Sequence, residues 1–230
     1  METSLHRDLK LLYAGKKAQF EVPVAGYRVD ALSRGRLIEV QHGSFTAIRD
    51  KVRALLGEHQ VTVVKPIVAR KVLVKQAAKG GEVLERRLSP KRGTLLDLFD
   101  ALVHFTRVFP HPRLTLEVIL VEVEEWRYPG HGRRRRWRLN DHEVEDQKLL
   151  AIHGKHRLRT AADLARLVRC PLPPTFHTGE LAASLDVRRW VAQRIAYCLH
   201  RTGAVREVGK QGNARLYEWA CARGRSLRAG

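Results

Sequence analysis

The stretch VDALSRGRLIEVQ, residues 29–41, decides the fold of the first part of this chain. Two β-type runs flank Arg34 and Gly35, and a glycine-containing pair at such a place is typical of a two-residue hairpin loop. Counting back from that loop, Asp30 falls directly opposite Glu39. The sequence therefore predicts a hairpin in which two acids face each other across neighbouring strands.

Opposed residues on antiparallel strands have Cβ atoms about 4.5–5.5 Å apart, so like charges there destabilise the sheet. Because side chains alternate, Gln41 shares a face with Asp30 and Glu39, and three oxygen ligands converge. Such ligands suit Mg²⁺ or Mn²⁺, ions that stabilise phosphoryl charge and supply hydroxide. In the alternative interpretation the acids are solvated and Arg28 and Arg36 offset their repulsion.

The pattern around the hairpin predicts an α/β core. Its elements alternate as α-β-β-β-α-β, namely a helix at 3–14, strands at 18–24, 27–33 and 36–42, a helix at 45–56 and a buried strand at 61–69. Further along, we expect a hairpin of 71–76 with 82–87, a helix at 94–107 and a strand at 114–126.

The last third of the chain has a different pattern. Helix signals at 160–168, 178–185 and 187–201 precede two short strands at 204–208 and 214–219. Three helices followed by a β-hairpin is the order of a winged helix-turn-helix. We therefore expect two domains, residues 1–145 and residues 146–230, with the boundary near 145.

Charge favours nucleic acid as the partner. The chain holds 43 Lys and Arg against 24 Asp and Glu, and residues 146–230 alone hold 16 against 6. So large an excess favours DNA as a partner over a merely solubilising surface. A membrane surface is less favoured, because no lysine-rich amphipathic helix stands out in the sequence. The sequence METSLHRDLK has no signal-peptide core, so we expect a cytoplasmic, nucleoid-associated protein. Three widely spaced cysteines indicate neither a disulfide framework nor a zinc cluster.

Several basic residues are candidates for DNA contact. Lys91 and Arg92 precede a helix start, which predicts either a phosphate site or an ordinary basic turn. The predicted helix 187–201 is the candidate recognition helix, with its Trp190, Ile195 and Cys198 assigned to the core. The remaining candidates are Arg133, Arg134, Arg135 and Arg136 of a basic arm with Trp137, Arg188, Arg189 and Gln193 of the recognition helix, and Lys210 and Arg215 of the wing.

The chain resembles the PD-(D/E)XK nuclease superfamily, and more closely a bacterial family that joins such a core to a C-terminal winged helix. The resemblance rests on E-x-x-LH-x-x-LK at 2–10, GY-x-VDAL at 26–32, LIEVQ at 37–41, F-x-AIR-x-K at 45–51, RRLSPKRG at 86–93 and GKQGNARLY at 209–217. It implies a restriction-endonuclease-like core with a mixed sheet.

The resemblance also implies roles for particular residues. Asp30 and Glu39 would hold the metal, Glu2 would complete the site, and Gln41 stands where the superfamily usually has a lysine. Glutamine can orient a water but carries no charge. Lys51 and Lys65 are candidates to replace the lysine, although each is more simply a surface or strand-end residue. Glu21 is an alternative to Glu2, and His42 is expected on the opposite face in a structural role.

Two functions from different classes follow. The first is a Mg²⁺- or Mn²⁺-dependent DNA endonuclease whose winged helix recruits duplex or branched DNA. The second is a non-catalytic DNA-binding regulator with a degenerate nuclease-like scaffold. A homodimer is left open in both. The opposed acids favour the enzyme, because a regulator has no need to keep them.

Overall fold

The computed structural model describes residues 2–130, 141–168 and 170–220. Its largest feature is a seven-stranded mixed sheet with strand order β1-β2-β3-β4-β6-β7, in which β5 pairs with β4 outside that path. β3, β4 and β6 run parallel, and the other neighbours are antiparallel. The strands are β1 (Gln19–Val24), β2 (Tyr27–Ser33), β3 (Arg36–Val40), β4 (Gln60–Gln76), β5 (Val83–Leu88), β6 (Leu114–Pro129) and β7 (His142–Leu158).

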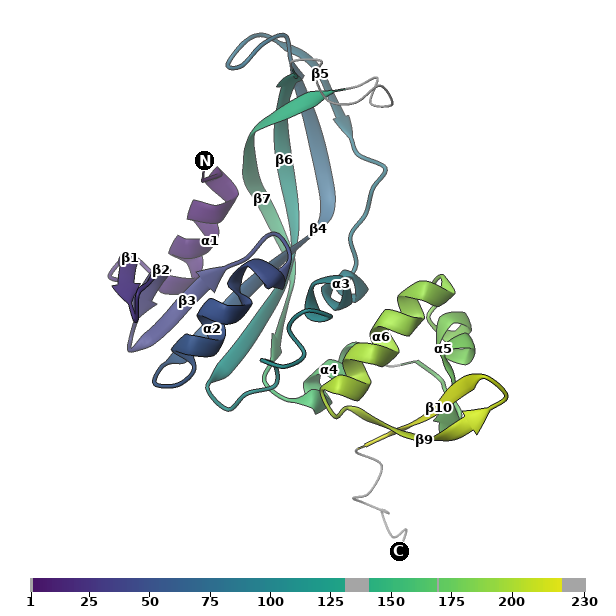
Figure 1. Ribbon diagram of the computed structural model, residues 1–230. Coiled ribbons are helices and arrows are strands. Elements are labelled where there is room, and N and C mark those ends of the chain that lie inside the picture. Colours follow the sequence, from purple (N-terminus) through teal and green to yellow (C-terminus); the bar gives the residue numbers. More distant parts are fainter. Residues whose placement is uncertain (1, 131–140, 169, 221–230) are drawn as a thin grey trace, which may run out of the picture.

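Helices cover both faces of the sheet (Figure 1). α1 (Ser4–Ala14) buries Leu5 and Leu9 against Ile38, Val40 and their neighbours on one face. The opposite face carries the short 3₁₀ turn η1 (Phe45–Ile48), α2 (Arg49–Leu55), the turn η2 (Leu95–Asp97) and α3 (Leu98–Leu102). Because side chains alternate along β3 and β4, these strands contribute to two separate apolar layers, one on each face of the sheet.

The hairpin forms with the predicted loop, and its ladder includes the predicted pairs except that of Asp30 with Glu39. Arg34 and Gly35 both have positive φ, 51° and 73°, as a two-residue loop with the twist of a hairpin requires. Ala31 pairs with Ile38 and Ser33 with Arg36, which is the expected register. The backbone pairing of β2 with β3 stops at Ala31. Beyond it, the Asp30 carboxylate accepts a hydrogen bond from the Val40 amide at 2.7 Å.

Three predictions about the middle of the chain were wrong. The strands expected at 61–69 and 71–76 are one continuous strand, β4, because Val68 and Arg70 straddle a bulge rather than a break. The helix expected at 94–107 is shorter, with η2 and α3 covering only 95–102. The boundary expected at 145 falls inside β7, which stays paired with β6 as far as Leu158.

β7 was missed because it lacks the apolar alternation of a half-buried strand. Its polar side chains pair instead with glutamates of β6: Gln147 donates to Glu125 at 2.7 Å, and Arg157 to Glu117 at 2.5 Å. Polar and ionic pairs between the strands therefore take a place that apolar contacts usually fill. In Figure 1 the upper halves of β4, β6 and β7, with β5, extend beyond the helices.

The C-terminal part contains three helices and a three-stranded antiparallel sheet of order β8-β10-β9. The predicted helices and strands of this part are confirmed as elements, and β8 is an addition. Their bounds are α4 (Ala161–Leu167), β8 (Thr175–Phe176), α5 (Thr178–Ser184), α6 (Arg189–Arg201), β9 (Val205–Gln211) and β10 (Ala214–Trp219). α6 packs beside α3, where the Cys198 thiol donates to the Phe99 carbonyl at 3.7 Å (Figure 1).

The same apolar cluster runs from α2 and α3 into α5 and α6. The fold class is therefore α/β, with a large mixed sheet and several helices. Among the described residues, no helix is long and apolar enough to cross a membrane.

Candidate acid and base cluster at the hairpin

Asp30 and Glu39 lie where β2 and β3 meet α1 and α2. The Glu39 side chain is 9% exposed and that of Asp30 is 16% exposed, so neither is the solvated surface acid of the alternative interpretation. Burial of two neighbouring carboxylates is costly without compensating partners. The surrounding residues supply these partners.

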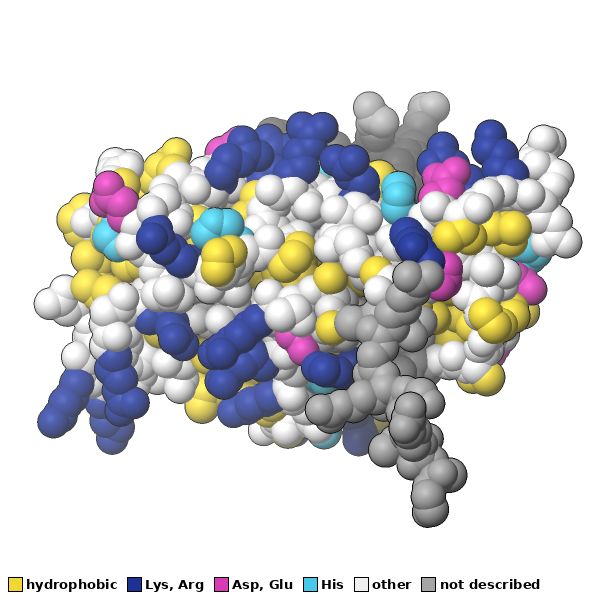
Figure 2. All heavy atoms as spheres, turned by 90° about the horizontal axis from the view of Figure 1, so that it is seen from below, with side chains coloured by type: hydrophobic (Ala, Val, Ile, Leu, Met, Phe, Trp, Pro, Cys, Tyr) yellow, Lys and Arg dark blue, Asp and Glu magenta, His cyan; other side chains and the backbone are white. Residues whose placement is uncertain are grey.

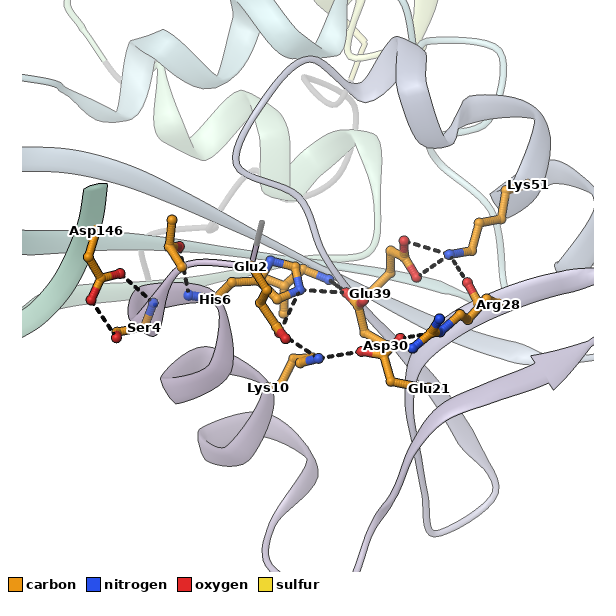
Figure 3. A network of polar contacts seen from close by, with 12 residues as sticks. Glu2, Ser4, His6, Lys10, Glu21, Arg28, Asp30, Glu39, Lys51 and Asp146 are labelled. Atoms are coloured by element: carbon orange, nitrogen blue, oxygen red, sulfur yellow. Dashed lines mark hydrogen bonds and ion pairs between the residues drawn. The ribbon is translucent and has the colours of Figure 1, made fainter. Parts of the chain in front are cut away.

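Two groups lie against the acids (Figure 3). The Nζ atom of Lys51, on α2, lies 2.6 and 2.7 Å from the two carboxylate oxygens of Glu39 and donates to the Arg28 carbonyl at 2.5 Å. The Nε2 atom of His6, on α1, lies 3.4 Å from Oδ2 of Asp30. The charge of Lys51 thus offsets that of Glu39.

A second set of ion pairs joins the N-terminal helix to β1. Lys10 Nζ lies 2.6 Å from Glu2 and 2.5 Å from Glu21, and Arg28 binds the other oxygen of Glu21 at 2.7 Å. Glu2 and its alternative Glu21 thus both reach the cluster, through a shared lysine. Figure 3 shows these side chains converging from the helix and the two strands.

The cluster borders an open pocket of about 540 Å³. Asp30 and His6 line it, so these groups are accessible to a substrate, whereas Glu39 is not among the lining residues. The full lining is Glu2, Thr3, His6, Glu21, Arg28, Asp30, His42 and Gln147.

The two central acids have pKa values shifted in opposite directions. Burial acts to raise the pKa of Asp30, but hydrogen bonds from His6 and the Val40 amide outweigh it, and the pKa is lowered. The pKa of Glu39 is raised, first by burial and then by the charge of Asp30, despite the nearby Lys51. Pairs of acids with divergent pKa values are typical of sites that divide roles between them.

Gln41 follows directly after β3. Its Nε2 donates to the Ser44 carbonyl at 2.8 Å, so the side chain closes the turn into η1. His42 was expected on the opposite face, and this was wrong. β3 ends at Val40, the alternation stops there, and the His42 ring stacks on His6 with centroids 5.6 Å apart.

Neither Lys51 nor Lys65 is the surface lysine of the simpler interpretation. The Lys51 side chain is 15% exposed, and Lys65 is 7% exposed overall. Lys65 Nζ donates to the carbonyls of His42 and Gly43 at 2.5 and 2.6 Å, and burial lowers its pKa to about 8. Lys51 contacts an acid of the site, and Lys65 holds the backbone beside it.

The chemistry of the donor set fits a hard divalent ion, since Asp30, Glu39 and Glu2 offer carboxylate oxygens from three elements. Their arrangement differs from a formed metal centre. Within residues 2–130, 141–168 and 170–220, no three His, Cys, Asp or Glu side chains are placed to hold one ion. Lys51 occupies both oxygens of Glu39, so an ion at this acid requires Lys51 to move aside.

The predicted DNA contacts are dispersed. Lys91 and Arg92 are exposed, but the adjacent helical turn is capped by Asp97, whose carboxylate accepts from the Thr94 amide at 3.1 Å. An acid already there disfavours the predicted phosphate site. Arg133, Arg134, Arg135, Arg136 and Trp137 lie outside the described residues.

On α6, Arg188 and Arg189 are exposed at the helix start. Ile195 and Cys198 are buried, as predicted, whereas Trp190 is 47% exposed and its assignment to the core was wrong. The reason is that Trp190 faces the hollow between α6 and α3, where the Arg194 guanidinium lies 4.7 Å from its ring centroid.

Gln193 lines the same hollow between α6 and α3. At the β9–β10 hairpin Lys210 is exposed, and Arg215 pairs with Glu207 at 3.1 Å. On the face shown in Figure 2, Lys and Arg side chains form separate groups with few acids beside them.

Sheet, helices and buried acid cluster define an α/β protein with a charged site at one end of its sheet. The chain belongs to the family described as "Domain of unknown function (DUF8091)", whose model matches residues 3–159. The match ends one residue after β7, and it includes the residues of the hairpin cluster except Glu2.

A relative from Treponema pallidum (strain Nichols), described as "Uncharacterized protein", is 28% identical over 218 residues. The alignment covers 94% of this chain and 84% of that protein, so it spans both the large sheet and the C-terminal helices. No solved structure matches the chain significantly.

Proposed function

We propose that this protein is a metal-dependent DNA endonuclease related to the PD-(D/E)XK superfamily. The observation that carries the proposal is the contact of Lys51 with Glu39, at 2.6 and 2.7 Å. The strand lacks the usual lysine at Gln41, and a lysine on the neighbouring helix reaches the same acid instead. A buried ammonium placed close to a reacting phosphate can stabilise developing negative charge.

The residues of the cluster have different roles in the proposed reaction. Asp30, Glu39 and Glu2 would hold Mg²⁺ or Mn²⁺, which when bound supplies phosphate charge stabilisation and an acidified water. Gln41 positions a water from the turn at Ser44, and Lys51 neutralises charge once it leaves Glu39. The pocket gives a phosphate group access to Asp30.

The C-terminal helices and hairpin support DNA recruitment. A helix, a short strand, two further helices and a two-stranded wing follow one another, which is the order of a winged helix. Arg188 and Arg189 are exposed at the start of α6. Residues 146–230 hold 16 Lys and Arg against 6 Asp and Glu, and this excess favours a backbone-binding role. A cytoplasmic, nucleoid-associated location agrees with this role.

Cleavage of supercoiled plasmid and branched DNA, with and without Mg²⁺ or Mn²⁺, tests the proposal. We expect metal-dependent cleavage that disappears in Asp30→Asn and Glu39→Gln, while DNA binding and folding persist. Calorimetry should show Mn²⁺ binding to the wild type and none to Asp30→Asn. Glu85→Gln is the matched control, because Glu85 is half exposed and paired only at the surface with Arg87. A wild type that binds no metal and cleaves neither substrate contradicts the proposal.

The second candidate is a DNA-binding regulator with an inactive nuclease-like scaffold. It is favoured by the ion pair of Glu2 with Lys10, which satisfies that acid inside the protein without an added ion. In that case Asp30→Asn and Glu39→Gln change stability but leave DNA affinity and its metal dependence as in the wild type.

A further inference from the structure

One side of α6 carries two exposed aromatic residues. Trp190 is 47% exposed and Tyr197 is 45% exposed, and the two lie two helical turns apart, which is about 10.5 Å along the helix axis. The opposite side of the helix buries Ala192, Ile195 and Leu199 in the core. Burial of that side fixes the helix, so both rings are presented outward on a rigid element.

Arginine side chains lie on the same side of α6 as the two rings. At about 3.6 residues per turn, four residues fall on one narrow stripe of the helix surface. In chain order they are Trp190, Arg194, Tyr197 and Arg201, here called the aromatic stripe. The Arg194 guanidinium lies 4.7 Å from the Trp190 ring centroid, and its Nη1 atom lies 2.6 Å from Oδ1 of Asp100 on α3. The ion pair and the cation-π contact together hold this guanidinium beside the indole.

The aromatic stripe borders a hollow between α6 and α3. The hollow has a volume of about 480 Å³ and is lined by Val103, Trp190, Gln193, Arg194 and Tyr197. Its wall therefore combines two aromatic faces with the hydrogen-bonding groups of an amide and a guanidinium. A nucleobase has the complementary chemistry, because it offers a flat ring for stacking and edge atoms for hydrogen bonds.

The charge of α6 favours a polyanion as the partner. Within Arg189–Arg201 there is no Asp or Glu, and the arginines of this helix are exposed. Asp100 offsets the charge of Arg194 alone. Tyr, Trp and Arg are also enriched in protein interfaces. However, an excess of 43 Lys and Arg over 24 Asp and Glu disfavours contact with a second copy of this chain and favours a phosphate backbone.

Aromatic side chains distinguish unpaired bases from paired ones. In a duplex both faces of a base are already stacked on its neighbours, so an exposed indole or phenol ring finds a base face only where a strand is unpaired. We propose that the aromatic stripe of α6 binds the unpaired bases of single-stranded or branched DNA. This inference rests on the proposed function for DNA as the partner and names the structure of that DNA. It requires no cleavage step.

Fluorescence anisotropy of the full chain without metal tests the inference. Three labelled probes of equal length are compared: single-stranded oligo-dT, an abasic single strand and a duplex. The wild type should bind oligo-dT more tightly than the abasic strand. Trp190→Ala and Tyr197→Ala should each weaken oligo-dT binding by about 5- to 150-fold, the loss expected for one base-aromatic stack. Their binding to the other two probes should change by less than about twofold, because no stacked base is lost.

Tryptophan fluorescence gives a second measurement of the same contact. Oligo-dT should quench the emission of the wild type by stacking on the indole. Trp190→Phe should lose that quenching but keep much of the affinity, because it retains an aromatic face. Leu84→Ala is the matched control, since Leu84 is an apolar side chain, 57% exposed, on β5 away from α6 (Figure 1). This control should bind all three probes as the wild type does, and circular dichroism melts verify that each variant is folded.

Several results overturn the inference. Equal losses on all three probes show that the rings contact no base. Unchanged oligo-dT binding in folded Trp190→Ala and Tyr197→Ala has the same meaning. Self-association that Trp190→Ala abolishes, in a wild type without preference for oligo-dT over the abasic strand, assigns the aromatic stripe to a contact between copies. If the wild type cleaves duplex plasmid with metal, the proposed function stands even when these results go against the stripe. A wild type that binds no DNA overturns both.

Discussion

Lys51 Nζ lies 2.6 and 2.7 Å from the two carboxylate oxygens of Glu39, and both side chains are largely buried. The two residues are 12 apart in the sequence and come from α2 and β3. Their contact joins the helix layer to the sheet at the candidate site. It also balances an acid whose burial alone would be unfavourable.

Lys51→Met should therefore destabilise the protein by about 3–5 kcal/mol, because it leaves Glu39 buried and unpaired. Urea unfolding measures the change. Arg87→Met is the control: its pair with Glu85 is half exposed, so it should cost at most about 1 kcal/mol. Adding Glu39→Gln to Lys51→Met should recover part of the loss. No recovery would mean that Lys51 contributes through packing rather than charge.

The hairpin could be predicted from its own residues. Its loop and its register follow from strand periodicity and from Arg34-Gly35, which are local properties. Lys51 could be proposed only as one of two candidates, because its approach to Glu39 depends on how α2 docks on the sheet. Local periodicity does not encode that docking geometry.

His6 was missed for a different reason. A single histidine has no metal-type spacing, and its contact with Asp30 depends on α1 lying over β2. A signal was nevertheless present: Glu2 and His6 are four residues apart, so they share one side of the N-terminal turn. His42 was misplaced because strand alternation was extended two residues past the end of β3 at Val40.

Neutralising the two acids should have opposite effects on stability. The pKa of Asp30 is lowered, so its charge stabilises the fold above the ordinary value of 3.8, and this contribution is lost as pH falls through the folded-state pKa. Asp30→Asn should thus destabilise near neutral pH, with the difference shrinking in acid. Repulsion between Asp30 and Glu39 alone would give a slight stabilisation instead.

The pKa of Glu39 is raised, so its contribution is present below the ordinary 4.5 and is lost as pH rises through the folded-state pKa. Relative to Glu39→Gln, the wild type should gain stability on acidification. Thermal melts of both variants across pH measure these differences. Parallel curves for Asp30→Asn and Glu39→Gln would contradict the opposed shifts.

Lys65 should make stability depend on pH in the alkaline range. Burial lowers its pKa from 10.5 to about 8, so its contribution is present above 10.5 and is lost as pH falls through 8. The wild type should gain on the order of 3 kcal/mol relative to Lys65→Met as pH rises across that window. The lost hydrogen bonds to His42 and Gly43 add only a constant offset. A difference that does not vary with pH would show that the pKa of Lys65 is the same in the folded and unfolded states.

Arg188 and Arg189 should contact DNA from the start of α6. If either reads guanine, its alanine variant should lose about 1–3 kcal/mol of affinity on some sequences only. If it binds phosphate, the loss of affinity should be the same on all sequences. The slope of the logarithm of the binding constant against the logarithm of the salt concentration should then fall in magnitude by about 1. Arg206→Ala is the control, because Arg206 pairs with Glu218 on the hairpin at 2.8 Å. Titrations at several salt concentrations on two unrelated duplexes separate these cases, and equal effects of all three variants would exclude a special role for α6.

Gln41→Lys tests whether Lys51 stands in for the missing strand lysine. Lys51→Met should lower plasmid nicking by about 10²–10³-fold, the loss expected when one charge-stabilising group is removed. A lysine at 41 starts from the end of β3, two residues beyond Glu39, so it can supply an ammonium to the same site. Gln41→Lys should keep or raise wild-type activity and restore at least about tenfold to Lys51→Met. Gln41→Ala should lower activity, because it removes the hydrogen bond to Ser44 and supplies no charge. If Gln41→Lys restores nothing to a folded Lys51→Met protein, Lys51 acts on the stability of Glu39 and not on the phosphate.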